Sequence, residues 1–153
     1  TDFIRENGWF GIGSDSNICT RATQELRTLE YSQRLIHRKR NALCSEQLPN
    51  VGAYLWSKAA QGGARAAGRN SGAIATGMQA NFVELNYDSQ GAMAAIASEA
   101  VLDFHIFSGQ SHELGNVYLK GAKVIDNGCH PKEDEINQSY FRSLQRLSKK
   151  LKS

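Results

Sequence analysis

The stretch Gly11-Ile12-Gly13-Ser14-Asp15-Ser16-Asn17 decides the predicted fold, because it joins a short apolar run to a long helical pattern. The apolar run, residues 9–12, is bounded by glycines, as a buried strand is. A strand that ends here places the carboxylate of Asp15 at its C-terminal tip, between two serines. In barrels of alternating strands and helices, such tips carry the catalytic groups. The alternative is that Asp15, Ser16 or Asn17 only caps the helix that follows.

Composition places the chain among ordinary globular proteins. It has 153 residues, of which 41% are hydrophobic and 22% charged. The net charge of +3 is too small to indicate a nucleic-acid partner, and no apolar run approaches the ~18 residues of a membrane span. The three cysteines are odd in number and contain no Cys-x-x-Cys pair, so neither a disulfide framework nor a thiolate zinc site is indicated. We therefore expect a cytoplasmic protein that binds neither nucleic acid nor membranes.

Two helices are predicted in the first half of the chain. Residues 20–43 carry an apolar stripe at helical spacing, with charged residues opposite. A second helix is predicted from Val51 to about Ala67, with Asn50 as its cap and Gly68 as its end. The stripe of the first helix consists of Ala22, Leu26, Leu29, Ile36 and Leu43.

The second predicted helix contains two adjacent glycines, Gly62 and Gly63, among many alanines. Each glycine costs a helix about 1 kcal/mol relative to alanine. Close approach of another backbone would offset that cost, so we expect this helix to be largely buried.

Short strands and a terminal helix are predicted after Gly68. The last helix begins after Pro131, where three acidic residues suit the positive end of the helix dipole. Its apolar stripe consists of Ile136, Tyr140, Leu144, Leu147 and Leu151. The other predicted elements are strands at 73–75 and 82–86, a helical segment or loop at 91–102, a strand at 105–107 and a hairpin over 116–125 that turns at Lys120-Gly121. The pattern predicts an α/β fold.

Several segments resemble the C-terminal part of the formimidoylglutamate deiminases, a family of the metal-dependent amidohydrolase superfamily. Residues 10–16 and the helix Glu25-Leu26-Arg27-Thr28-Leu29-Glu30-Tyr31-Ser32-Gln33-Arg34-Leu35 carry the likeness to this family. Residues 72–83 are similar to the superfamily pattern Gly-x-Ile-x-x-Gly-x-x-Ala-Asp at the re-entry into its β-sandwich, with Asn81 in place of Asp. That replacement affects a turn contact and no chemistry. Residues 117–121 and 126–130 resemble the closing hairpin of the same sandwich.

The resemblance implies three segments. Residues 1–68 would be the last strand–helix unit of a TIM-type (β/α) barrel. Residues 69–131 would be the C-terminal part of a small β-sandwich, and residues 132–153 a terminal helix. The first residue is Thr rather than Met, which favours a fragment or a processed product.

The resemblance also implies a site and a reaction. Asp15 would be a ligand of zinc or another divalent metal, one ion in the complete site, and would take the proton of the metal-bound water. Ser14, Ser16 and Asn17 would contact Asp15 rather than the metal itself. The implied reaction converts the small molecule N-formimidoyl-L-glutamate and water to N-formyl-L-glutamate and ammonia, a step of histidine breakdown. The family commonly forms dimers, so we expect a homodimer at full length.

The histidines of the chain do not match the superfamily's metal ligands, which include a His-x-His pair. We therefore expect structural or surface roles for all four, and we expect the chain alone to be inactive. The four are His37, His105, His112 and His130.

Two alternatives remain open from the sequence. The sandwich segments fit a different deaminase or hydrolase of the superfamily, acting on another C–N bond, equally well. A non-enzymatic binding module is the second alternative, because a basic cluster at the end of the first helix could contact phosphates. The cluster is also consistent with a solvated helix end matched to the helix dipole. It consists of Arg34, His37, Arg38, Lys39 and Arg40.

Overall fold

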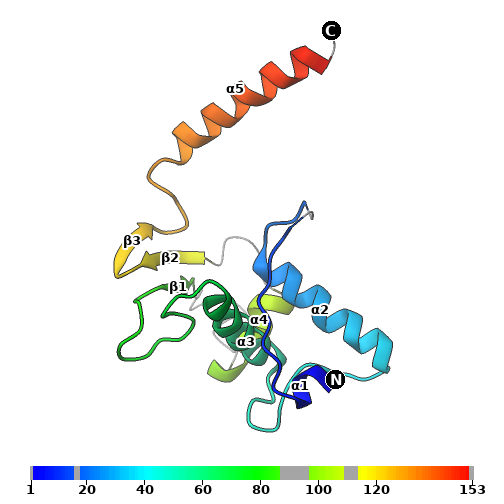
Figure 1. Ribbon diagram of the computed structural model, residues 1–153. Helices are drawn as coiled ribbons and strands as arrows, with labels where there is room; N and C mark the ends of the chain where they lie inside the picture. The colour runs from blue at the N-terminus through cyan, green and yellow to red at the C-terminus, as the bar shows by residue number, and fades with distance from the viewer. Residues whose placement is uncertain (1, 16–17, 87–96, 109–113, 152–153) are drawn as a thin grey trace.

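The computed structural model describes residues 2–15, 18–86, 97–108 and 114–151. Helices α2, α3 and α4 pack together, three short strands form one antiparallel sheet, and α5 projects away from both (Figure 1). The elements, in chain order, are α1 (Asp2–Arg5), α2 (Ala22–His37), α3 (Val51–Ala66), β1 (Phe82–Leu85), the 3-10 helix η2 (Ser98–Ala100), α4 (Val101–Phe107), β2 (Leu114–Leu119), β3 (Ala122–Ile125) and α5 (Glu133–Leu151).

The core lies where α2, α3 and α4 meet. Leu26 of α2, Leu55 of α3 and Ile106 of α4 are fully buried there. Helix α3 can approach α4 closely because a Cβ atom at Gly52 would lie only 2.5 Å from the backbone nitrogen of Asp103. The other buried apolar residues of this core are Leu43, Val51, Tyr54 and Ala59.

The two predicted helices of the first half are confirmed, with differences at their ends. Helix α2 ends at His37 because Arg38 takes a left-handed conformation (φ 50°), so the predicted continuation to Leu43 is wrong. Leu43 is nevertheless buried, in the loop after the helix, whereas Ile36 is 68% exposed. The apolar repeat of the sequence extends past the end of α2 because Leu43, in the loop that follows, also packs in the core.

The N-terminus of α3 is capped from a distant part of the chain. The side chain of Asn50 makes no capping hydrogen bond, so that part of the prediction is wrong. Instead, the backbone N–H of Gly52 donates to Oδ1 of Asp103, at 3.0 Å. A carboxylate at this position suits the positive end of the helix dipole. The contact joins α4 to α3 across 51 residues of sequence.

The hairpin between β2 and β3 is confirmed, and the strand β1 pairs antiparallel with β2. Lys120 and Gly121 both have positive φ, 52° and 80°, as a two-residue type I′ turn requires. The backbone N–H of Lys120 donates to Oδ1 of Asn81 at 2.8 Å, so the amide of Asn81 makes a turn contact itself. Phe82 and Tyr118 stack across the two strands with ring centroids 4.5 Å apart.

Three predicted strands are wrong. Residues 9–12 and 73–75 are irregular, and no strand among the described residues pairs with them. Residues 105–107 form the end of α4 instead of a strand. A short apolar run fits a strand or one face of a helix equally well, and here contacts with α2 and α3 favour the helix. Of the predicted helical segment 91–102, residues 91–96 lie outside the described residues, and residues 98–102 are helical.

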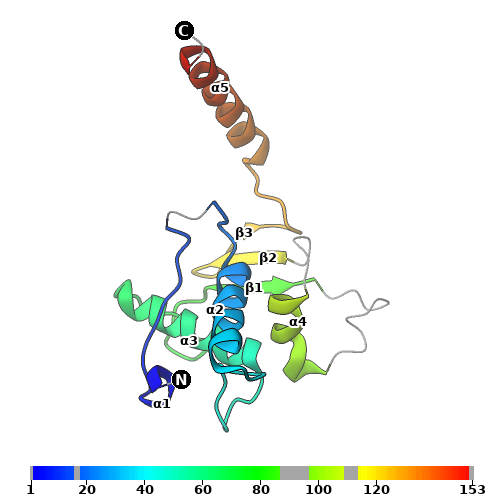
Figure 2. The same ribbon diagram turned by 90° about the vertical axis from the view of Figure 1, so that its right-hand side faces the viewer.

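The terminal helix is confirmed as α5, which stands clear of the other elements in both views (Figures 1 and 2). The mixed α/β arrangement with a small antiparallel sheet agrees with the predicted class. The barrel, the two-sheet sandwich and the segment boundaries stay predictions. Helix α4 packs on α2 and α3, so the core draws on both sides of residues 68–72. In the described residues, no helix is long and apolar enough to cross a membrane.

Candidate active site

Asp15 lies at an exposed turn between residues 9–14 and α2. Its backbone is left-handed, with φ 40°, a conformation that aspartate tolerates better than most residues. Ser14 beside it is half-buried. Ser16 and Asn17, the other two predicted site residues, lie outside the described residues. The turn presents the carboxylate of Asp15 to the exterior, where a ligand can reach it.

Helix α3 holds the segment that leads to Asp15. A Cβ atom at Gly62 would lie 2.6 Å from the carbonyl carbon of Phe10, so only glycine leaves room for this backbone crossing. A Cβ atom at Gly11 would lie 3.2 Å from the Cα atom of Gly63. The two adjacent glycines of α3, Gly62 and Gly63, therefore meet the N-terminal segment, as expected from their cost to a helix.

Two cations of α3 hold the start of the same segment. The ammonium of Lys58 lies 5.6 Å from the ring centre of Trp9, and the guanidinium of Arg65 lies 5.1 Å from it. Both distances are in the range of cation–π attraction. Trp9 itself is half exposed, at 50%. Together with the glycine contacts, these interactions fix residues 9–11 along α3.

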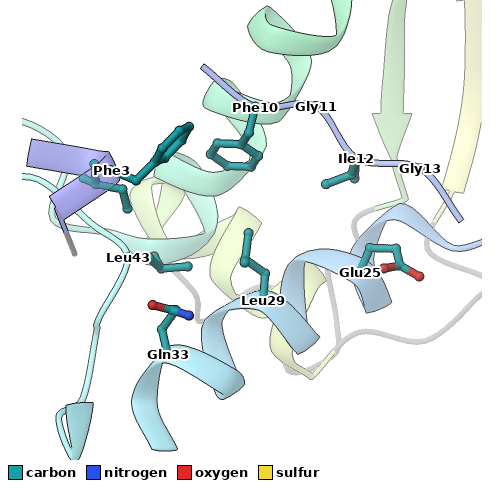
Figure 3. Close-up of a pocket in the computed structure, with 10 residues that line it drawn as sticks. Phe3, Phe10, Gly11, Ile12, Gly13, Glu25, Leu29, Gln33 and Leu43 are labelled. Atoms are coloured by element: carbon teal, nitrogen blue, oxygen red, sulfur yellow. The ribbon is translucent and has the colours of Figure 1, made fainter. Parts of the chain in front are cut away.

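A groove of about 510 Å³ lies between residues 3–13 and α2 (Figure 3). Glu25, Leu29 and Gln33 follow one another along the face of α2 that borders it. The sequence analysis did not identify this groove, although a spacing of four residues places these three side chains on one face. The remaining lining is mostly apolar: Phe3, Ile4, Phe10, Gly11, Ile12, Gly13 and Leu43.

The described part of this turn contains one carboxylate, that of Asp15. No group of three or more His, Cys, Asp or Glu side chains that could hold a metal ion occurs in residues 2–15, 18–86, 97–108 and 114–151. A zinc site needs three or four protein ligands. The described part of the chain therefore does not fit a complete metal site.

The described histidines have other surroundings. His37 is exposed, and His105 is buried with its ring 5.7 Å from that of Trp56, edge on. Nδ1 of His130 accepts a hydrogen bond from the backbone N–H of Lys132 at 3.1 Å. His112 lies outside the described residues. The structural or surface roles predicted for the three described histidines agree with these positions.

A buried carboxylate, Glu30, was missed by the sequence analysis. It is fully buried, and its oxygens accept hydrogen bonds from the backbone N–H groups of Ala42 and Leu43, both at 2.9 Å. Nε of Arg34 donates to the same carboxylate at 2.6 Å. Glu30 thereby fixes the loop after α2. The only sequence signal was a Glu–Arg pair at a spacing of four residues, which surface helices share.

The contacts of Arg34 separate it from the rest of the predicted basic cluster. The guanidinium of Arg34 also lies 5.4 Å from the ring centres of Tyr31 and Phe107, so it belongs to the contact between α2 and α4. His37 and residues 38–40 are exposed. Arg34 is engaged within the fold, so the basic surface is smaller than the sequence predicted.

Comparisons with known proteins test the resemblance directly. No family model matches the chain. The chain is 35% identical over 147 residues to a formimidoylglutamate deiminase of Pseudomonas aeruginosa, covering 96% of this chain and 32% of that protein. The predicted resemblance is confirmed.

A solved structure supports the similarity to the deiminase. An amidohydrolase from Brucella melitensis, known from its crystal structure, superposes with a TM-score of 0.84 at 36% identity, covering 95% of this chain and 32% of that one. The chain thus spans about a third of the length of each relative it matches. At this level of identity, the likeness extends to sequence as well as to the fold.

Proposed function

We propose that this chain forms part of an enzyme that converts N-formimidoyl-L-glutamate and water to N-formyl-L-glutamate and ammonia. The observation that carries the proposal is the 35% identity, over 96% of the chain, to a formimidoylglutamate deiminase. The exposed Asp15 turn, held by α3, is the chemical feature of the described residues that fits this reaction.

In the proposed reaction, oxygen from water bonds to the formimino carbon and the bond from that carbon to the departing nitrogen breaks. Water must lose protons, and the nitrogen must gain them before it leaves as ammonia. A carboxylate beside the reacting carbon can accept a proton from water and return it to nitrogen. We assign this role to Asp15, with Ser14, Ser16 and Asn17 as the residues that orient its carboxylate.

A divalent metal such as zinc, when bound, would lower the pKa of water to about 7. Asp15 would contribute one ligand to it. Because the described residues contain no group of three or more side chains that could hold a metal ion, the other ligands would come from the rest of the enzyme. The second candidate is hydrolysis of a different C–N substrate by the same site. The likeness to the Brucella amidohydrolase, which covers almost the same share of the chain, fits both candidates, because that name specifies no substrate.

Asp15→Asn in the complete enzyme tests the assignment. The substitution preserves size but removes the charge and the proton acceptor, so we expect kcat to fall at least about a hundredfold. Ammonia release and metal content are measured on the same preparations. Glu46→Gln, which neutralises another exposed carboxylate of this chain, serves as the matched control and should leave kcat unchanged. Near-normal turnover in Asp15→Asn would show that this residue has no part in the chemistry.

A further inference from the structure

The segment that leads to Asp15 is held by α3 on one side and borders a groove on the other. Phe10 and Gly11 lie against the backbone of α3, where a Cβ atom at Gly62 would collide with the carbonyl group of Phe10. On its other side, the segment borders the groove of about 510 Å³ that lies in front of α2 (Figure 3). A Cβ atom at Gly13 would have no neighbour within 4 Å. Among the described residues, the contacts with α3 therefore set the course of the chain toward Asp15.

The ring of Trp9 fixes where this segment lies along α3. Its centre is 5.6 Å from the ammonium of Lys58 and 5.1 Å from the guanidinium of Arg65. These two cations are about two helical turns apart on one face of α3, so a ring attracted to both is held at one place along the helix. The ammonium of Lys58 also lies 5.8 Å from the ring centre of Tyr54, which is buried. Trp9 itself is 50% exposed, so burial alone does not hold its ring.

We propose that Trp9 is a positioning residue for Asp15 and acts through the segment between them. The proposal rests on the proposed function, in which the carboxylate of Asp15 exchanges protons with the reacting groups. Proton transfer needs that carboxylate within hydrogen-bond distance of the group that gives or takes the proton. A displacement of about 1 Å can lower a rate about a hundredfold. Without the ring contacts, residues 9–11 can shift along α3, and Asp15, which follows closely in the chain, shifts with them.

Steady-state kinetics of the complete enzyme test the positioning role. Trp9→Leu removes the ring but keeps an apolar side chain. It should lower kcat about tenfold to a hundredfold and leave KM within about twofold, because Asp15 is assigned to proton transfer rather than to substrate binding. Trp9→Phe keeps a ring that attracts cations, so it should recover most of kcat. Arg69→Met removes an exposed arginine just after α3 and should leave kcat unchanged.

A double substitution in α3 separates positioning from a direct effect of charge on Asp15. Lys58→Met combined with Arg65→Met removes both cations and keeps long side chains, whereas Trp9→Leu keeps both cations. If the three residues act as one unit, the double substitution and Trp9→Leu should lower kcat equally, and combining all three should lower it no further. If the charges act on Asp15 directly, only the double substitution lowers kcat, and the positioning role of Trp9 is overturned.

Amide hydrogen exchange of the complete enzyme, followed by mass spectrometry, gives a readout that does not depend on turnover. Peptides that contain residues 9–15 should exchange faster in Trp9→Leu than in the wild type, Trp9→Phe should restore the slow rate, and peptides of α2 should not change. Faster exchange over all peptides would show a general loss of stability and overturn the positioning role.

The two measurements also separate the positioning role from the proposed function. A wild type that releases no ammonia from N-formimidoyl-L-glutamate would overturn the proposed function and the positioning role with it. An active wild type whose kcat is unchanged by Trp9→Leu, or lowered without faster exchange in residues 9–15, would overturn the positioning role alone.

Discussion

The adjacent glycines of α3 allow the contact with the N-terminal segment to be measured. Gly62→Ala and Gly63→Ala make the same chemical change in the same helix. A Cβ atom at Gly62 would collide with the carbonyl group of Phe10, whereas a Cβ atom at Gly63 would have no neighbour within 4 Å. The two substitutions should therefore change the free energy of unfolding in different ways.

The magnitudes follow from two terms. Replacing glycine by alanine inside a helix stabilises it by about 1 kcal/mol, and both variants gain this term. Forcing an extra methyl group against packed backbone costs about 1–3 kcal/mol, and only Gly62→Ala has this cost. Gly63→Ala should therefore be more stable than the wild type by up to about 1 kcal/mol. Gly62→Ala should be less stable than Gly63→Ala by about 1–3 kcal/mol, because the propensity gain cancels in the comparison.

Urea unfolding of the chain, followed by circular dichroism at 222 nm, measures both values. Equal slopes with urea concentration would show that the substitutions leave the extent of unfolding unchanged. If the two variants have the same stability within about 0.5 kcal/mol, the segment before Asp15 does not lie against α3 as described.

Three further predictions concern buried and half-buried side chains. Glu30→Ala should lower the free energy of unfolding in urea by about 3 kcal/mol, because it leaves buried N–H groups unpaired. Glu46→Ala, which changes an exposed carboxylate, should alter that free energy by no more than about 0.5 kcal/mol. Equal losses in the two variants would contradict the assigned contacts of Glu30. Asp103→Ala should lower the free energy of unfolding by about 1 kcal/mol, because α3 loses its helix cap, and Asn50→Ala should lower it much less. If Asn50 were the cap, the order of the two losses would be reversed. Burial, and then a neighbouring cysteine, raise the pKa of Tyr54 above 10.0, so its contribution to stability is present below pH 10 and lost as pH rises through the raised pKa. Absorbance titration at 295 nm should show one late tyrosine in the wild type that is missing in Tyr54→Phe, and identical curves would contradict this burial.

Elements whose signals are local could be predicted from the sequence. The hairpin at Lys120-Gly121 was found because a glycine, which readily adopts positive φ, stands between two short apolar runs. Helices α2, α3 and α5 were found because each carries a long stripe or a clear stop. Elements that depend on distant partners were not. Residues 105–107 are helical because α4 packs on two other helices, and no local feature of these three residues contains that information.

The site was predictable to a similar extent. Asp15 was identified from its position after an apolar run, but the contacts that hold its segment come from α3, about 50 residues later. Glu30 and Asp103 were missed because a buried carboxylate looks like a surface one until its hydrogen-bond donors are known. These donors are backbone N–H groups, which every residue type except proline carries, so residue identity could not point to them.

The measurement that tests the central claim most directly is product formation by the complete enzyme from N-formimidoyl-L-glutamate. Ammonia is measured by a coupled assay and N-formyl-L-glutamate by chromatography, in the same reaction and against a blank without enzyme. The proposed function predicts the two products in a one-to-one ratio, and no ammonia from the 153-residue chain alone. Absence of both products, with hydrolysis of a different C–N substrate by the same preparation, would contradict the deiminase assignment and favour the second candidate.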